Sequence, residues 1–196
     1  MRKNEPYIKI MAIDPGLNAL GVSLGYYYNQ KNKFIIQEYM TIHSNDQAKK
    51  EKRADFKMYG NLISLFTCEE AIHGLMEKWE PEFIVSEDAF YNPRMPNAFL
   101  SLKLCINAIQ RVLYQYNKVL YRIPPTVIKQ TIFGNGMASK AAVQEGIMNH
   151  DDIGFKEAKK KHVNRLIEHE ADSIAIGYAF IQLLLPDILM QRELKK

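Results

Sequence analysis

The sequence lacks the features of a secreted, membrane-spanning or zinc-binding protein. It has only two cysteines, Cys68 and Cys105, which lie among apolar residues of predicted helices and resemble neither a zinc motif nor a redox pair. We therefore expect reduced, buried thiols. The longest apolar stretch, Ile174 to Leu185, is interrupted by Gln182 and stopped by Pro186, and is shorter than the roughly 20 residues that a membrane span needs.

Signal peptides, linkers and repeats are also missing from the sequence. No apolar run near the N-terminus is long enough for a signal-peptide core. No stretch rich in proline, glycine or serine marks a linker. The 196 residues, 47% of them hydrophobic, are enough for one well-packed domain and few for two. We expect one domain over residues 1–196, in a cytoplasmic, DNA-associated protein that does not use a membrane.

Positive charge is concentrated in two clusters within a chain of net charge +4. Such runs are most often solvated faces, and the net charge alone is weak evidence for a polyanionic partner. The first cluster consists of Lys49, Lys50, Lys52 and Arg53, and the second of Lys156, Lys159, Lys160, Lys161, His162 and Arg165.

Three predicted strands come first, and strands then alternate with helices. The strands cover residues 7–13, 21–28, 33–42, 83–87 and 119–123, and the helices cover 58–79, 97–116, 126–133, 139–149 and 166–184. Short connections predict an antiparallel meander of the first three strands, and strand–helix alternation predicts parallel pairing afterwards. The fold class is therefore α/β, with a mixed five-stranded sheet flanked by helices.

Two helix starts and one helix face carry specific expectations. Asn97 and Ser139 are predicted N-caps. The period of the first helix places seven apolar residues on one inward face: Leu62, Leu65, Phe66, Ile72, Leu75, Met76 and Trp79.

Three acidic residues stand beside apolar segments. Asp14 ends the first strand, Glu87 ends the fourth, and Asp172 lies in the last helix. Taken singly, they read as a turn former, a strand-end surface residue and a solvated helix residue. If the first and fourth strands are parallel neighbours, Asp14 and Glu87 converge at the edge where α/β sheets bind ligands, and the helix can add Asp172.

Such a carboxylate cluster favours divalent cations. Oxygen ligands suit Mg²⁺ or Mn²⁺, and two such ions can clamp the attacking and leaving oxygens of a phosphodiester. His169 lies one helical turn before Asp172 and is a candidate metal ligand, proton carrier or surface histidine. Glu168 competes with His169 for the fourth position.

Four segments resemble the motifs of the RuvC family of Holliday junction resolvases. They follow in the family's order and cover most of the chain. They are Ile13-Asp14-Pro15-Gly16 with Gly21, Ile84 to Phe90, Val127 to Thr131 followed by Gly134 to Lys140, and His169 to Ile176. Any one of these motifs is weak evidence, because an Asp-Pro-Gly turn alone is common, whereas four in order are a strong signal.

The resemblance implies a ribonuclease-H-like fold and a metal-dependent endonuclease that cuts four-way DNA junctions as a homodimer. It implies that Asp14, Glu87, His169 and Asp172 bind metal, with two Mg²⁺ or Mn²⁺ ions per site. His169 would be a metal ligand or a general acid/base. Lys129 and Lys140 match family lysines that contact DNA near the active site, and Lys140 is also a candidate catalytic residue. Phe90 matches the family aromatic that stacks on a base, with a core phenylalanine as the alternative, and Arg94 in the same loop is a further candidate for DNA binding.

The chain departs from the family's pattern in length. The spans from Asp14 to Glu87 and from Lys140 to Asp172 are longer than in the bacterial enzymes, and the extra residues coincide with the basic clusters. This points to a viral or otherwise divergent member. The nearest alternatives are a branched-DNA debranching nuclease and an RNA–DNA hybrid hydrolase. More remote ones are an actin-like or sugar-kinase-type ATP-binding domain and a DNA-binding module without catalysis.

Overall fold

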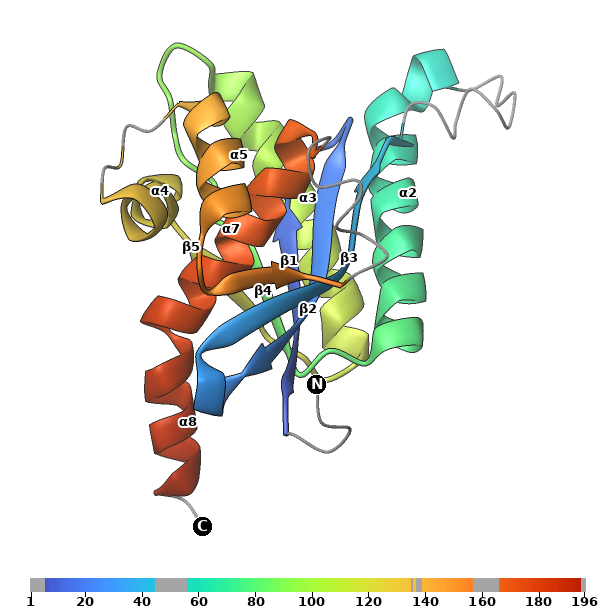
Figure 1. Cartoon of the computed structure of the whole chain (residues 1–196). Coiled ribbons are helices and arrows are strands. Elements are labelled where there is room, and N and C mark those ends of the chain that lie inside the picture. The colour runs from blue at the N-terminus through green and yellow to red at the C-terminus, as the bar shows by residue number, and fades with distance from the viewer. Residues whose placement is uncertain (1–5, 45–55, 135, 137–138, 157–165, 195–196) are drawn as a thin grey trace.

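A mixed six-stranded sheet forms the centre of the computed structural model, which describes residues 6–44, 56–134, 136, 139–156 and 166–194 (Figure 1). The side chains of residues 56–61, 133 and 140 lie outside that description. The strands are β1 (Ile8–Asp14), β2 (Leu20–Tyr28), β3 (Lys33–Ile42), β4 (Phe83–Glu87), β5 (Leu120–Ile123) and β6 (Ile153–Phe155). The helices are η1 (Asn29–Lys31), α2 (Phe56–Trp79), α3 (Pro96–Gln115), α4 (Pro125–Phe133), α5 (Lys140–Asn149), α7 (Glu168–Leu183) and α8 (Leu185–Glu193).

The strand order is β5-β4-β1-β2-β3-β6. Strands β1, β2 and β3 form the predicted antiparallel meander, and β4 pairs in parallel with both β1 and β5. The predicted count of five strands is wrong, because β6 adds a short parallel pairing to the outer side of β3. Three residues inside a polar segment carry no readable period, so only the neighbouring strand defines β6.

Helices cover both faces of the sheet. One core lies between the sheet and α4, α5, α7 and α8, and the other lies between the sheet and α2 and α3. Residues of β1 alternate between the two: Ala12 faces the α7 side, while Met11 and Ile13 face the α2 side. The buried cysteines Cys68 and Cys105 belong to the second core and form no disulfide, as predicted.

Two local predictions on α2 and α3 are wrong. Leu62 and Phe66 of α2 are 48% and 45% exposed, although the other five predicted inward residues pack in or against the core. The start of α3 is capped by Met95 without a side-chain hydrogen bond, and Asn97 lies inside the helix. Proline favours the first helical turn because its fixed φ is already helical, so Pro96 begins this helix.

The start of α5 and the end of α7 agree with the sequence predictions. Ser139 caps α5 as predicted, because its Oγ accepts a hydrogen bond from the Ala142 N–H at 3.3 Å. The last predicted helix, over residues 166–184, corresponds to α7, which ends at Leu183. The sequence did not predict α8, which follows after a bend of 44° and has Pro186 in its first turn. Within the described residues, no single helix is long and apolar enough to cross a membrane. The bent pair of α7 and α8 passes that test by length and composition only.

Candidate active site

The parallel pairing of β1 and β4 brings two predicted acids to the same edge of the sheet. Ile13 lies opposite Ser86, so Asp14 and Glu87 follow at the carboxyl ends of neighbouring strands. Strand alternation directs both side chains to the α7 side, because Ala12 and Val85 two residues earlier belong to the core on that side. The structure therefore contains the parallel pairing on which the predicted convergence of Asp14 and Glu87 depends.

Small residues let α7 approach this edge closely. Gly21 lies opposite Asp14 in the β1–β2 ladder, and a Cβ atom at Gly21 would lie 2.2 Å from the His169 carbonyl oxygen. Further along α7, a Cβ atom at Gly177 would lie 3.1 Å from the Cβ of Ala12. The N-terminal turns of α7 therefore lie directly over the end of β1.

His169 contacts Asp14 from α7. The His169 Nδ1 and an Asp14 carboxylate oxygen lie 2.7 Å apart, within hydrogen-bond distance. This hydrogen bond raises the pKa of His169 above its ordinary value, and the charges of Asp14, Glu168 and Asp172 raise it further, against a lowering by burial. The structure thus brings His169, one of the two candidates for the fourth position, to the Asp14 carboxylate.

Glu87 is a strongly perturbed acid of the site. Its burial is the largest cause, and the negative charges of Asp14 and Asp172 add to it, so the pKa of Glu87 rises to about 8. The positive charge of Lys129 acts in the opposite direction. A strongly raised carboxyl pKa marks a place where negative charge lacks compensation, and such places are often functional.

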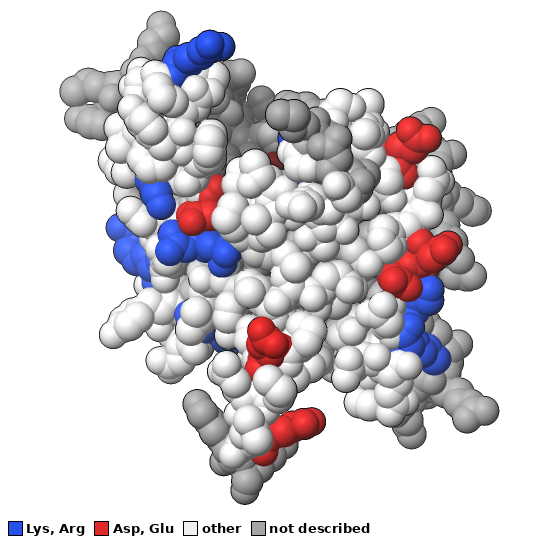
Figure 2. All heavy atoms as spheres, turned by 90° about the vertical axis from the view of Figure 1, so that its left-hand side faces the viewer, with Lys and Arg blue, Asp and Glu red and all other residues white. Residues whose placement is uncertain are grey.

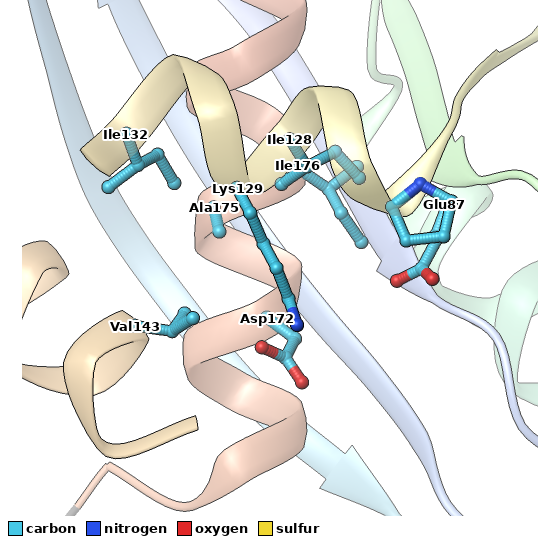
Figure 3. Close-up of a pocket in the computed structure, with 9 residues that line it drawn as sticks. Glu87, Ile128, Lys129, Ile132, Val143, Asp172, Ala175 and Ile176 are labelled. Carbon is cyan, nitrogen blue, oxygen red and sulfur yellow. The ribbon is translucent and has the colours of Figure 1, made fainter. Parts of the chain in front are cut away.

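A cavity of about 170 Å³ opens beside these acids (Figure 3). Glu87 and Asp172 line it together with Lys129 of α4, and in Figure 3 the Lys129 ammonium group points towards the Asp172 carboxylate. The rest of the wall is largely aliphatic, formed by Pro125, Ile128, Ile132, Val143, Ala175 and Ile176. The sequence did not indicate this apolar wall, because it forms where α4, α5 and α7 meet.

The donor set fits a hard divalent cation. Carboxylates from Asp14, Glu87 and Asp172 supply oxygen ligands and three negative charges, and a cation would remove the repulsion that raises the pKa of Glu87. Among the described residues, no three His, Cys, Asp or Glu side chains form a group that could by itself hold a metal ion. The carboxylate chemistry of these residues suits Mg²⁺, which proteins usually bind through one or two carboxylates together with water or phosphate oxygens.

Of the other predicted DNA-contacting residues, two lie in the loop between β4 and α3 and one lies at the start of α5. Phe90 is 64% exposed, which rules out the alternative of a core phenylalanine, and Arg94 is exposed in the same loop before α3. Lys140 is the first residue of α5, and its side chain lies outside the description. The first basic cluster and all of the second except Lys156 also lie outside the described residues.

Sequence reasoning missed a group of charged residues on the other side of β4. Asp88 contacts Lys103 of α3 and Arg122 of β5 at the end of the strand that carries Glu87. The three residues are scattered in the sequence and carry no motif, so only the pairing of β4 with β5 and the position of α3 reveal them.

Known proteins share this sequence pattern and this fold. No family model matches the chain. The crossover junction endodeoxyribonuclease RuvC of Finegoldia magna is 25% identical over 181 residues, which cover 89% of this chain and 93% of the relative. RuvC of Fusobacterium nucleatum is 25% identical over 177 residues, covering 90% and 82%.

Solved structures show the same architecture. Thermus thermophilus RuvC in complex with a Holliday junction substrate superposes with a TM-score of 0.67 at 19% identity, covering 88% of this chain and 92% of that one. The fowlpox virus Holliday junction resolvase gives a TM-score of 0.56 at 14% identity, covering 90% and 100%.

The sheet topology and the superpositions define this protein as an α/β protein with a ribonuclease-H-like fold, the fold that the resemblance implied. Within that class, the chain is similar in sequence to RuvC crossover junction endodeoxyribonucleases and in fold to solved Holliday junction resolvases.

Proposed function

We propose that this protein is a Holliday junction resolvase, a metal-dependent endonuclease that hydrolyses phosphodiester bonds at four-way or otherwise branched DNA. The observation that carries the proposal is the meeting of Asp14, Glu87 and α7 at one sheet edge, within a chain related to RuvC endodeoxyribonucleases over about nine-tenths of its length. Intact acids at these positions argue against a binding module that has lost catalysis.

The residues of the site would have two roles, binding cations and transferring protons. Asp14, Glu87 and Asp172 would bind the cations through their carboxylates. Two divalent ions, Mg²⁺ or Mn²⁺, would activate a water and stabilise the leaving 3′ oxygen when bound there. His169 is within hydrogen-bond distance of Asp14, so it can orient that carboxylate, accept a proton or complete the ligand set.

Residues around the cavity would hold the DNA. Lys129 presents a positive charge in the cavity that Glu87 and Asp172 also line, where a phosphate would lie against the cations. Phe90 offers an exposed ring for stacking on a base, with Arg94 and Lys140 as phosphate contacts. An exposed aromatic beside a phosphate-cutting site suits a junction, because bases at a crossover are accessible for stacking.

The substrate's two-fold arrangement favours a homodimer, which would place one site on each of two symmetric strands. The faces of α2 and α3 that turn away from the sheet carry exposed apolar side chains, which are typical of an interface. They are Leu62, Phe66, Leu100 and Leu104. We place the interface on α3, and the exposed residues of α2 extend that surface.

Cleavage of a labelled four-way junction tests the proposal, using wild-type protein and Asp14→Asn with and without Mg²⁺. We expect Asp14→Asn to bind the junction and to cut it at least about 100-fold more slowly, because cation stabilisation of the transition state amounts to several kcal/mol. Glu145→Gln removes an exposed acid of α5 and is the control that should cut normally.

Substrate comparison separates the alternatives. A debranching nuclease would prefer Y-forks, and a hybrid hydrolase would cut RNA–DNA duplexes faster than junctions. Full cleavage by Asp14→Asn would refute the assignment of the site.

A further inference from the structure

Two cations converge on Asp88, the residue that follows Glu87. One Asp88 carboxylate oxygen lies 3.2 Å from Arg122 Nη1 and 3.7 Å from Lys103 Nζ, and it also accepts the Ala89 N–H at 2.8 Å. The Asp88 N–H donates to the Ile123 carbonyl oxygen at 2.9 Å, so the backbone continues the pairing of β4 with β5. Asp88 therefore fixes Lys103 and Arg122 side by side at the end of β4.

This cation pair carries more positive charge than Asp88 neutralises. The Lys103 and Arg122 side chains are 36% and 37% exposed and that of Asp88 is 34% exposed, so all three reach solvent. Ion pairs with this exposure contribute little to stability, commonly below about 1 kcal/mol. Folding alone therefore gives little reason to gather two cations on one acid.

The pair lies at the active-site edge, on the opposite side of β4 from the carboxylates. Glu87 lines the cavity with α4 and α7, whereas Asp88 contacts α3 and β5. Consecutive residues of a strand project to opposite faces with a rise of about 3.3 Å, so a strand of DNA that crosses this edge passes both groups. Figure 2 shows the face on the left-hand side of Figure 1, where many of the described Lys and Arg side chains lie towards one margin of the view.

Lys103 also contacts an aromatic ring that packs against the loop bearing Phe90. The Lys103 ammonium lies 5.6 Å from the centre of the Phe99 ring, and that ring packs edge-on against Tyr91 with the ring centres 5.4 Å apart. Tyr91 directly follows Phe90, whose ring is exposed. The cation pair is thus connected to the aromatic loop by direct contacts.

We propose that Lys103 and Arg122 form a phosphate-binding pair that holds the DNA backbone next to the cleaved phosphodiester, on the α3 side of β4. An arginine fork can donate two hydrogen bonds to one phosphate, and a lysine beside it adds a point charge. The identity of the polyanion as DNA rests on the proposed function. The binding chemistry of the pair rests on its own contacts.

The salt dependence of DNA binding tests the pair directly. The Kd for a labelled four-way junction is measured in EDTA, so that no strand is cut, between 50 and 200 mM salt for wild type and for the double variant Lys103→Gln/Arg122→Gln. We expect weaker binding and a plot of log Kd against log salt that is flatter by about 1, because each phosphate contact contributes about 0.9 to the slope. Lys103→Gln alone, on the helix surface, should change the slope in the same direction.

Matched variants exclude other causes. The charge-preserving variant Lys103→Arg/Arg122→Lys should keep the wild-type slope. Arg111→Gln removes an arginine of α3 that contacts Glu69 of α2, and it should also leave the slope unchanged. A folded double variant with the wild-type slope, or an equal loss in Arg111→Gln, would overturn the proposal.

Binding and cutting report on different conclusions. If wild type cuts junctions but the double variant keeps the wild-type salt slope, the phosphate-binding pair is refuted and the proposed function is not. A protein that shows the expected slopes but cuts no junction in Mg²⁺ refutes the proposed function and leaves the pair standing.

Discussion

Replacing Glu87 with glutamine should stabilise the metal-free protein at neutral and alkaline pH. The pKa of Glu87 rises from 4.5 to about 8 on folding, mainly through burial and then through the charges of Asp14 and Asp172. Each pKa unit corresponds to about 1.4 kcal/mol, so the full rise corresponds to about 5 kcal/mol of destabilisation when Glu87 is ionised. Local relaxation reduces this figure, and we expect a gain of about 2–4 kcal/mol for Glu87→Gln at pH 8.

The sign of the pH dependence follows from proton counts. Between pH 4.5 and about 8 the unfolded chain has lost the Glu87 proton and the folded chain still holds it. The unfolded state then binds fewer protons, so the free energy of unfolding falls as pH rises through this window. Glu87→Gln has no proton to lose at this position and should show a flatter curve.

The assay is thermal unfolding in EDTA at pH 5 and at pH 8, with Glu145→Gln as the exposed control. For a chain of this size, 1 kcal/mol corresponds to about 2–4 °C, so Glu87→Gln should unfold about 5–15 °C above wild type at pH 8. The difference in unfolding temperature between Glu87→Gln and wild type should be smaller at pH 5, and Glu145→Gln should unfold at the same temperature as wild type at both pH values. Addition of Mg²⁺ should stabilise wild type and leave Glu87→Gln nearly unchanged. Parallel pH curves for wild type and Glu87→Gln would refute the reasoning.

Two further predictions concern α7 and its contact with the sheet. His169→Gln should destabilise the metal-free protein more at pH 5 than at pH 9. The pKa of His169 is raised on folding, so its stabilisation is complete below the pKa of the unfolded state and is lost as pH rises through the pKa of the folded state. Equal losses of unfolding free energy at both pH values in a denaturant titration would contradict this. Gly21→Ala should destabilise the fold by about 2–4 kcal/mol and reduce cleavage, because the new methyl group would meet the His169 carbonyl oxygen. Gly74→Ala on α2 has no atom within 4 Å of the new methyl group and should be neutral or slightly stabilising, by up to about 1 kcal/mol, in the same measurement.

The sequence by itself determined the elements that carry the site. Buried strands that end in Asp14 and Glu87 are readable because an acid directly after an apolar run has few structural reasons to be there, and Asp172 is readable as an acid within a buried helix. The meander followed by strand–helix alternation was equally visible, because the period of hydrophobic residues records which faces are buried.

Only the tertiary structure decided what lies beside those acids. The hydrogen-bonded His169–Asp14 pair depends on how closely α7 approaches β2, which the absence of a side chain at Gly21 allows. The apolar wall of the cavity, the strand β6 and the exposure of Leu62 and Phe66 likewise depend on which elements pack together. Lys103, Asp88 and Arg122 meet only because β5 pairs with β4 and α3 packs beside them, and local sequence patterns carry no information about such long-range contacts.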